Sequence, residues 1–274
     1  MDAANNANFR TTRELFESTL EGEYDDDRPW AAVRALHKRD TPEVFEVASE
    51  FCHSPNPLKR ARGLDVLAQL GCCNPSAERP YFDDCVQIAM RHLADEDPLP
   101  VHAAAWALAH LADDRAVAAL VGMQTSADSG VRWAVVFGIA GSGHPEAIST
   151  LINLMEDDDE DVRNWATFGL GAQSVEDSPQ IRDALRKRLA DPFSEARDEA
   201  IWGLALRKDP IGIRMLLERL ETDAWVQGDE VTATDILGLP SSADTTIEEL
   251  CSGLRQTLAG FESREGHSSD SALP

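Results

Sequence analysis

The sequence has few basic residues and no long apolar run. It carries 25 Lys and Arg against 49 Asp and Glu, which gives a formal net charge of −24 at pH 7. A surface of this sign repels phosphate backbones and anionic lipid, so nucleic acid and membrane are disfavoured as partners. No stretch approaches the roughly 20 apolar residues that span a bilayer. A cationic partner is the natural complement of the charge, although acidity alone also keeps a protein soluble, even in high salt.

Cysteine is scarce and odd in number, with five residues in the chain. The first twenty residues, MDAANNANFRTTRELFESTL, lack the basic start and apolar run of a signal peptide. This combination predicts reduced thiols in a cytoplasmic protein. No zinc-binding spacing is formed by Cys52-His53, Cys72-Cys73, Cys85 and His92. We therefore interpret the cysteines as core residues and expect no metal and no cofactor.

Sequence signatures of common enzymes are also missing. The chain contains no phosphate-binding loop, no Gly-x-Ser-x-Gly turn and no nucleotide-binding fingerprint. None of the seven histidines is followed by glutamate. No catalytic residue is predicted, and the sequence favours a protein that is not an enzyme.

What the sequence does contain is internal repetition. Four segments align, and their starts are separated by 31, 31 and 34 residues: PVHAAAWALAHL from 100, VRWAVVFGIAGS from 131, VRNWATFGLGAQ from 162 and ARDEAIWGLALR from 196. Further helical patterns lie at 42–51, 58–70, 81–93, 115–124, 146–155, 179–189 and 211–220. No comparable run of alternating apolar residues predicts a sheet. The period predicts an all-α fold, an α-solenoid of about six helix pairs that stack into one continuous core.

Proline marks the expected helix starts. At the first helical position it gives up an N–H group that has no partner anyway, and Asn, Ser or Asp before it can cap the remaining N–H groups. The pairs are Asn56-Pro57, Asp97-Pro98, Ser178-Pro179, Asp191-Pro192 and Asp209-Pro210.

The repeat weakens toward both ends of the chain. Residues 1–27 are predicted to hold an N-terminal capping helix, within 9–20, and the acidic loop EGEYDDD. The solenoid is predicted over 28–221 and a pair of C-terminal capping helices over 222–261. The last segment, 262–274, is polar and is predicted to be a disordered tail.

Two of the repeated segments resemble a known family. DEDVRNWATFGLGA and VRWAVVFGIAGSGHPEAISTLINLMED are similar to HEAT repeats of the short type found in phycobilisome-lyase-like (PBS lyase) proteins. The similarity is carried by an acidic turn, Val-Arg, a small residue and a small-apolar-small pattern. It covers about 28–221 and is strongest over 97–207. It implies an armadillo/HEAT-like α-α superhelix and says little about activity, because this fold serves many unrelated roles.

One face of each repeated helix is apolar or small. We number registers from Pro100, Val131, Val162 and Ala196, so that registers one, five, eight and nine fall on one side of the helix. They hold Pro100, Ala104, Ala107, Leu108; Val131, Val135, Gly138, Ile139; Val162, Ala166, Gly169, Leu170; and Ala196, Ala200, Gly203, Leu204. We predict that this face is the core and that the small residues at register eight let helices approach closely.

The opposite face is aromatic at register seven in all four repeats. Register seven holds Trp106, Phe137, Phe168 and Trp202, although the chain has only 6 Trp, 2 Tyr and 9 Phe. Register three adds His102, Trp133, Asn164 and Asp198, while register ten is small: Ala109, Ala140, Gly171 and Ala205. The resemblance implies that these helices line the concave side, which predicts a concave aromatic binding groove. Alternatively, the rings pack on one another between adjacent repeats.

Register two holds Arg132, Arg163 and Arg197. The resemblance implies that such arginines pair with acidic residues of the preceding turn, here 156–161 and Glu195. We interpret this ladder as mainly structural. An arginine that faced the groove would be a groove-edge charge, able to clamp a carboxylate or to stack on a ring.

These observations favour a non-enzymatic scaffold or adaptor that binds another protein, through a basic or aromatic segment, in the groove. The family also implies an alternative, a lyase-like protein that binds a small ligand such as a flat tetrapyrrole or attaches a chromophore. Deoxyhypusine hydroxylase, an iron enzyme built on this kind of repeat, needs His-Glu dipeptides and is disfavoured. DNA glycosylases with HEAT-like repeats need a basic cleft, which the net charge opposes.

Overall fold

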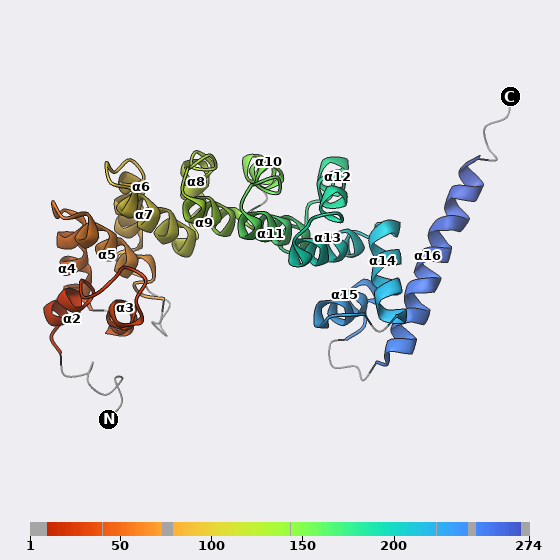
Figure 1. The fold of residues 1–274 in the computed structure, drawn as a ribbon, viewed down its shortest axis with the longest axis horizontal. Coiled ribbons are helices and arrows are strands. Elements are labelled where there is room, and N and C mark those ends of the chain that lie inside the picture. The colour runs from red at the N-terminus through yellow and green to blue at the C-terminus, as the bar shows by residue number, and fades with distance from the viewer. Residues whose placement is uncertain are drawn as a thin grey trace. The chain divides into compact units, whose positions relative to one another are not determined.

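A computed structural model describes residues 10–39, 41–72, 79–142, 144–222, 224–240 and 245–269. Within these ranges every regular element is a helix and no strand occurs, which confirms the prediction of an all-α fold (Figure 1). No helix in this part of the chain is both long and apolar enough to cross a bilayer. The chain divides into two compact units, residues 1–139 and 140–274, called unit 1 and unit 2.

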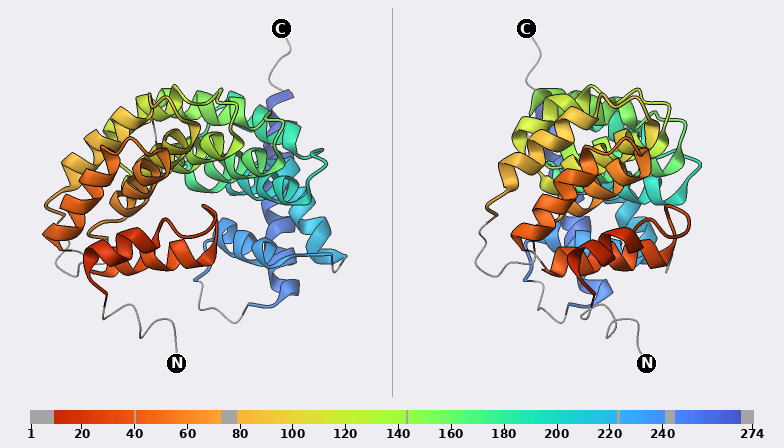
Figure 2. Two further views of the ribbon diagram at one scale, coloured as in Figure 1. Left: turned by 60° about the vertical axis from the view of Figure 1, so that its left-hand side comes forward. Right: turned by 90° about the vertical axis from the view of Figure 1, so that its left-hand side faces the viewer.

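Unit 1 consists of an N-terminal pair followed by repeated pairs. Helices α2 (Thr12–Ser18) and α3 (Asp27–Arg39) pack against each other (Figure 2). The following pairs are α4 (Pro42–Cys52) with α5 (Pro57–Ala68), α6 (Phe82–His92) with α7 (Pro98–Leu111), and α8 (Val117–Val121) with α9 (Ser129–Ile139). Helix α8 is short because the 3-10 turn η2 (Asp114–Ala116) precedes it. Helices α5, α7 and α9 lie side by side (Figure 1).

Unit 2 continues the pattern and ends in three helices that pack on one another. Its pairs are α10 (Pro145–Leu154) with α11 (Glu160–Phe168), and α12 (Pro179–Arg188) with α13 (Ser194–Leu206). The final helices are α14 (Pro210–Glu221), α15 (Gln227–Leu237) and α16 (Ile247–Ser269). Residues 262–269 of the expected tail therefore continue α16, and 270–274 lie outside the described residues.

The helix starts follow the capping pairs that the sequence indicates, with one exception. Asn56 accepts hydrogen bonds from two N–H groups in the first turn of α5, and Ser178 and Asp209 each accept one in α12 and α14. After Asp191-Pro192, helix α13 begins two residues later than expected, at Ser194.

The expected core face is buried. Every residue at registers one, five, eight and nine of the four repeated helices is buried except Gly138, which is half-buried. A Cβ atom built on Gly203 of α13 would lie 2.7 Å from the Cα atom of Gly171. Small residues are therefore needed where the repeated helices meet.

The end of α11 departs from a regular helix. Residues Gly169–Gln173 form a π-helical turn, η3, and Arg207 supports it. The Arg207 guanidinium donates to the carbonyl oxygens of Leu170 and Gly171 at 2.7 and 2.6 Å, and to those of Ser174 and Glu176, both at 2.9 Å. Burial lowers the pKa of Arg207 below its ordinary value. These four contacts and a fifth, to the Gly203 carbonyl oxygen at 3.0 Å, replace the water that this guanidinium loses.

Substitution of Gly203 by alanine tests the close approach of helices in unit 2. The added methyl group overlaps the Gly171 backbone, so we expect a loss of about 1–3 kcal/mol in the free energy of unfolding. Gly260→Ala is the matched control, because nothing lies within 4 Å of a Cβ atom at that helical position. The control should be neutral or gain up to ~1 kcal/mol. Equal urea midpoints for the two variants would contradict the packing described here.

Candidate functional site

Three rings of the expected groove lie together in unit 1. Helix α7 presents Trp106, and α9 presents Trp133 and Phe137 one turn apart on the same face. The ring centroids of Trp106 and Trp133 are 4.4 Å apart. Those of Trp133 and Phe137 are 5.6 Å apart, with an angle of 12° between the ring planes. We call Trp106, Trp133 and Phe137 the aromatic platform.

The aromatic platform is partly open to solvent. The two tryptophans are half-buried, whereas 42% of Phe137 is exposed. The rings therefore pack on one another across adjacent repeats, as the structural alternative expects, and still present apolar surface. Stacked rings gain from their mutual contact beyond the area that they bury, which holds an exposed ring in place.

Two histidines border the aromatic platform. The His102 ring lies 6.4 Å from that of Trp106, and its Nδ1 is 3.0 Å from the Asp128 carboxylate. Burial opposes ionisation of Asp128, but the hydrogen bond and charge of His102 lower the pKa of this carboxyl overall. The His110 ring lies 5.8 Å from Trp106 and 5.4 Å from Phe137. His110 was not predicted, although its position four residues after Trp106 is the signal that places both on one face.

The aromatic residues of α11 form a second, smaller exposed cluster, in unit 2. Phe168 is half-buried and its ring lies 5.5 Å from that of Trp165, edge to face. Trp165 is 37% exposed and was not predicted, because it stands at register four. Asn164, the register-three residue, has a buried Oδ1 atom with no hydrogen-bond partner in the described part of the chain.

At the last repeated helix the expected groove needs correction, because the C-terminal helices cover it. Trp202 donates from Nε1 to the buried Asp229 carboxylate of α15 at 2.7 Å. Arg219 then joins Asp229 to Asp198, at 2.9 and 2.7 Å. Gly228 lies directly on the Trp202 ring, where any side chain would overlap it. Trp202 and Asp198 are therefore committed to holding α15.

The register-two arginines bind main-chain carbonyls of the turn before their helix. The acceptors lie six residues back in each case: Ser126 for Arg132 at 2.8 Å, Asp157 for Arg163 at 2.7 Å and Asp191 for Arg197 at 2.6 Å. Arg60 of α5 makes the same contact with Ser54 at 3.1 Å. The expected partners were carboxylates of that turn, and these contacts go to its carbonyl oxygens. Arg163 also pairs with the Asp191 carboxylate at 3.2 Å. A guanidinium has several N–H donors in a rigid plane, so one arginine can hydrogen-bond more than one carbonyl oxygen of a turn. This supports the structural interpretation of the ladder.

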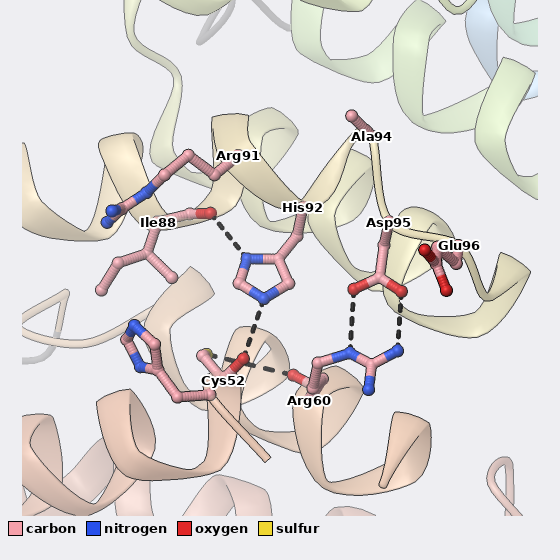
Figure 3. A pocket seen from close by; sticks show the side chains of 9 residues that line it. Cys52, Arg60, Ile88, Arg91, His92, Ala94, Asp95 and Glu96 are labelled. Atoms are coloured by element: carbon pink, nitrogen blue, oxygen red, sulfur yellow. Dashed lines mark hydrogen bonds and ion pairs between the residues drawn. The ribbon is translucent and has the colours of Figure 1, made fainter. Parts of the chain in front are cut away.

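A pocket of about 550 Å³ lies where α4, α5 and α6 meet in unit 1 (Figure 3). Its wall contains an ion pair, because Arg60 contacts Asp95 at 2.7 Å and Asp97 at 2.6 Å. The His92 ring spans from the Ile88 carbonyl to the Cys52 carbonyl, at 2.9 Å each, and so ties α6 to α4 (Figure 3). These polar groups serve to hold two helix pairs together.

The cysteine-histidine group gathers partly at this pocket. Burial raises the pKa of the Cys52 thiol to about 12, which leaves it protonated and a poor nucleophile at neutral pH. Cys73 lies outside the described residues. Among the residues that are described, no three His, Cys, Asp or Glu side chains gather as metal ligands would.

Glu199 of α13 is a largely buried carboxyl beside Asp198. Its Oε2 atom is buried without a hydrogen-bond partner in the described residues. Burial and the charge of Asp198 raise the pKa of Glu199 to about 7.

The raised pKa of Glu199 predicts that the contribution of this residue to the stability of unit 2 falls with rising pH. The ordinary pKa is 4.5, so folding takes up a proton between about pH 4.5 and 7. The stability contributed by Glu199 is complete below that window and is lost as pH rises through it. Glu199→Gln removes the titration. Relative to the wild type, the variant should gain about 1–3 kcal/mol more in the free energy of unfolding at pH 8 than at pH 4.5. The exposed Glu218→Gln is the control, and the same pH profile for both variants would contradict the assignment.

Trp202→Phe tests whether this ring holds the C-terminal helices. The variant keeps the ring but removes the hydrogen bond to buried Asp229, which should cost about 1–3 kcal/mol in urea unfolding. Trp106→Phe is the matched change, since the Trp106 indole N–H makes no hydrogen bond within the described residues. An equal loss in both variants would show that only ring size matters.

Comparisons with known proteins agree with this architecture. A family model described as PBS lyase HEAT-like repeat matches residues 101–122, and one described as HEAT repeats matches residues 122–180. Both matches fall inside the stretch where the sequence resemblance is strongest, and they confirm it there. The Protein YibA of Escherichia coli K12 is 28% identical over 214 residues, which are 76% of this chain and 74% of YibA.

Solved structures share the fold. The X-ray structure of the Escherichia coli YibA protein has a TM-score of 0.70 at 24% identity, covering 93% of this chain and 94% of that one. The archaeal HEAT-like repeats protein from Thermococcus onnurineus NA1 has a TM-score of 0.52 at 15% identity, covering 91% and 98%. The chain is therefore an α-solenoid of the armadillo/HEAT-like class.

Proposed function

We propose that this HEAT-repeat protein is a non-enzymatic interaction module whose aromatic platform binds a segment of a partner protein. The observation that carries the proposal is the 42% exposure of Phe137 on a stack of two tryptophans. Contiguous apolar surface of this kind marks binding sites, and tryptophan is enriched among the residues that dominate binding energy. Within unit 2, the exposed Trp165–Phe168 pair is proposed as an apolar binding surface in its own right.

Charge favours a basic partner segment. Helices α7 and α9 contain one arginine and no lysine, and that arginine, Arg132, donates to the Ser126 carbonyl. The nearby Arg115 is paired with Asp113 and Asp83. Since the chain as a whole carries a net charge of −24, a basic segment meets little repulsion here.

One polar pair beside the platform resembles part of a catalytic arrangement. His102 and Asp128 are arranged like a base and its orienting carboxylate. In the described residues, however, no hydroxyl or thiol group is hydrogen-bonded to the His102 imidazole. In acyl transfer such a base acts on a hydroxyl or thiol that is hydrogen-bonded to it.

Phe137→Ser tests the proposal, with Ile211→Ser as the matched control. Ile211 on α14 is 40% exposed and lies outside the platform. Proteins retained by the immobilised wild type should bind Phe137→Ser about tenfold more weakly or worse, as for a central anchor residue. They should bind Ile211→Ser unchanged. Thermal unfolding of both variants separates lost binding from lost folding.

Equal retention by both variants would overturn the proposed site. A coloured ligand that copurifies with the wild type, and not with Phe137→Ser, would instead favour the alternative of tetrapyrrole binding.

A further inference from the structure

The rings of the aromatic platform form a stack without space between its members. The angle between ring planes is 12° for Trp133 and Phe137, 31° for Trp106 and Trp133, and 37° for Trp106 and Phe137. Their centroids lie 4.4–6.2 Å apart, which is contact distance for aromatic pairs. An aromatic cage for a methylated ammonium group needs rings arranged around an open space. The platform therefore offers a ring surface to a ligand and no cage.

The open part of this stack is Phe137. Trp133 lies along one side of it and His110 approaches at 5.4 Å, so only the side toward solvent is free for a ligand group. The next member of a nearly parallel stack is most favourably another flat group. In a protein segment the flat groups are aromatic rings, guanidinium groups, side-chain amides, carboxylates and peptide planes.

Electrostatics selects among these flat groups. Aromatic ring faces carry partial negative charge, which attracts cations. The Asp128 carboxylate stands at the His102 edge of the platform, and Arg132 is turned back to the carbonyl oxygens of residues 126 and 127. No fixed cation of α7 or α9 is thus left to occupy the ring face.

Resting on the proposed function, we infer that the aromatic platform selects arginine within a basic partner segment, with the planar guanidinium stacked on Phe137. A guanidinium is flat and weakly hydrated, so it keeps its remaining hydrogen bonds at its edge while its face lies on the ring. A lysine ammonium carries the same charge but is compact and strongly hydrated, and it cannot extend a stack. The platform should therefore distinguish the two basic residues.

Three matched peptides test this inference. Each has eight residues with arginine, lysine or citrulline at four alternate positions and serine elsewhere, and citrulline keeps the flat shape without the charge. Binding to the full-length protein is measured by tryptophan fluorescence. We expect the arginine peptide to bind at least about threefold more tightly than the lysine peptide. The citrulline peptide should bind more weakly than the arginine peptide. Equal affinity of the arginine peptide and either other peptide overturns the inference.

Phe137→Leu provides the variant arm, because leucine keeps apolar bulk on α9 and removes only the ring. This variant should lose the preference for arginine over lysine, while Ile211→Leu should retain it. Retention of the preference in Phe137→Leu would overturn the inference even if the protein folds normally.

The same measurements separate this inference from the proposed function. A fourth peptide carries phenylalanine at the same four positions. If it binds most tightly and its binding requires Phe137, the proposed interaction role stands and arginine selection is overturned. If no peptide and no retained protein responds to substitution of Phe137, the proposed binding site itself fails.

Discussion

The close approach of the repeated helices is the constraint on which the rest of this structure depends. Register eight is Ala107, Gly138, Gly169 or Gly203, and at Gly203 even one added carbon atom would meet the Gly171 backbone. Helices packed this tightly leave no room for large side chains in their interface. The aromatic residues at the neighbouring register seven must therefore lie outside it. Outside the interface, the aromatic rings pack on one another or on a helix that covers them.

What covers a ring decides its role. Trp106 and Phe137 stand on two neighbouring helices, α7 and α9, so their rings meet each other and stay partly open. Trp202 is on the last repeated helix of its unit, and α15 closes over it with Gly228 and Asp229. The same residue type at the same register is thus a surface in one repeat and a point of attachment in another.

The sequence predicts the features that depend on a single helix and its nearest neighbours. The core registers and most helix starts follow from periodicity and capping, and helical register places the aromatic residues on one face of each helix. Features that depend on distant segments of the chain could not be predicted from the sequence. Asp229 over Trp202, Arg207 on the π-helical turn and the burial of Glu199 each join residues about 25 or more apart, or depend on how two helices meet. Helical register says which side chains share a face, but not which later segment lies on that face.

The binding of arginines to carbonyl oxygens also shapes what a partner meets before contact. Arg60, Arg132, Arg163 and Arg197 donate to carbonyl oxygens of their own turns, and Arg60 and Arg163 also pair with carboxylates. Basic residues number only about half the acidic residues of the chain. The field in the surrounding water is correspondingly dominated by carboxylates. At physiological salt it extends only about 8 Å, yet a field of this kind accelerates and orients the approach of a cationic segment. In the proposed function, attraction at a distance and recognition at the ring surface belong to different residues, and each can change without the other.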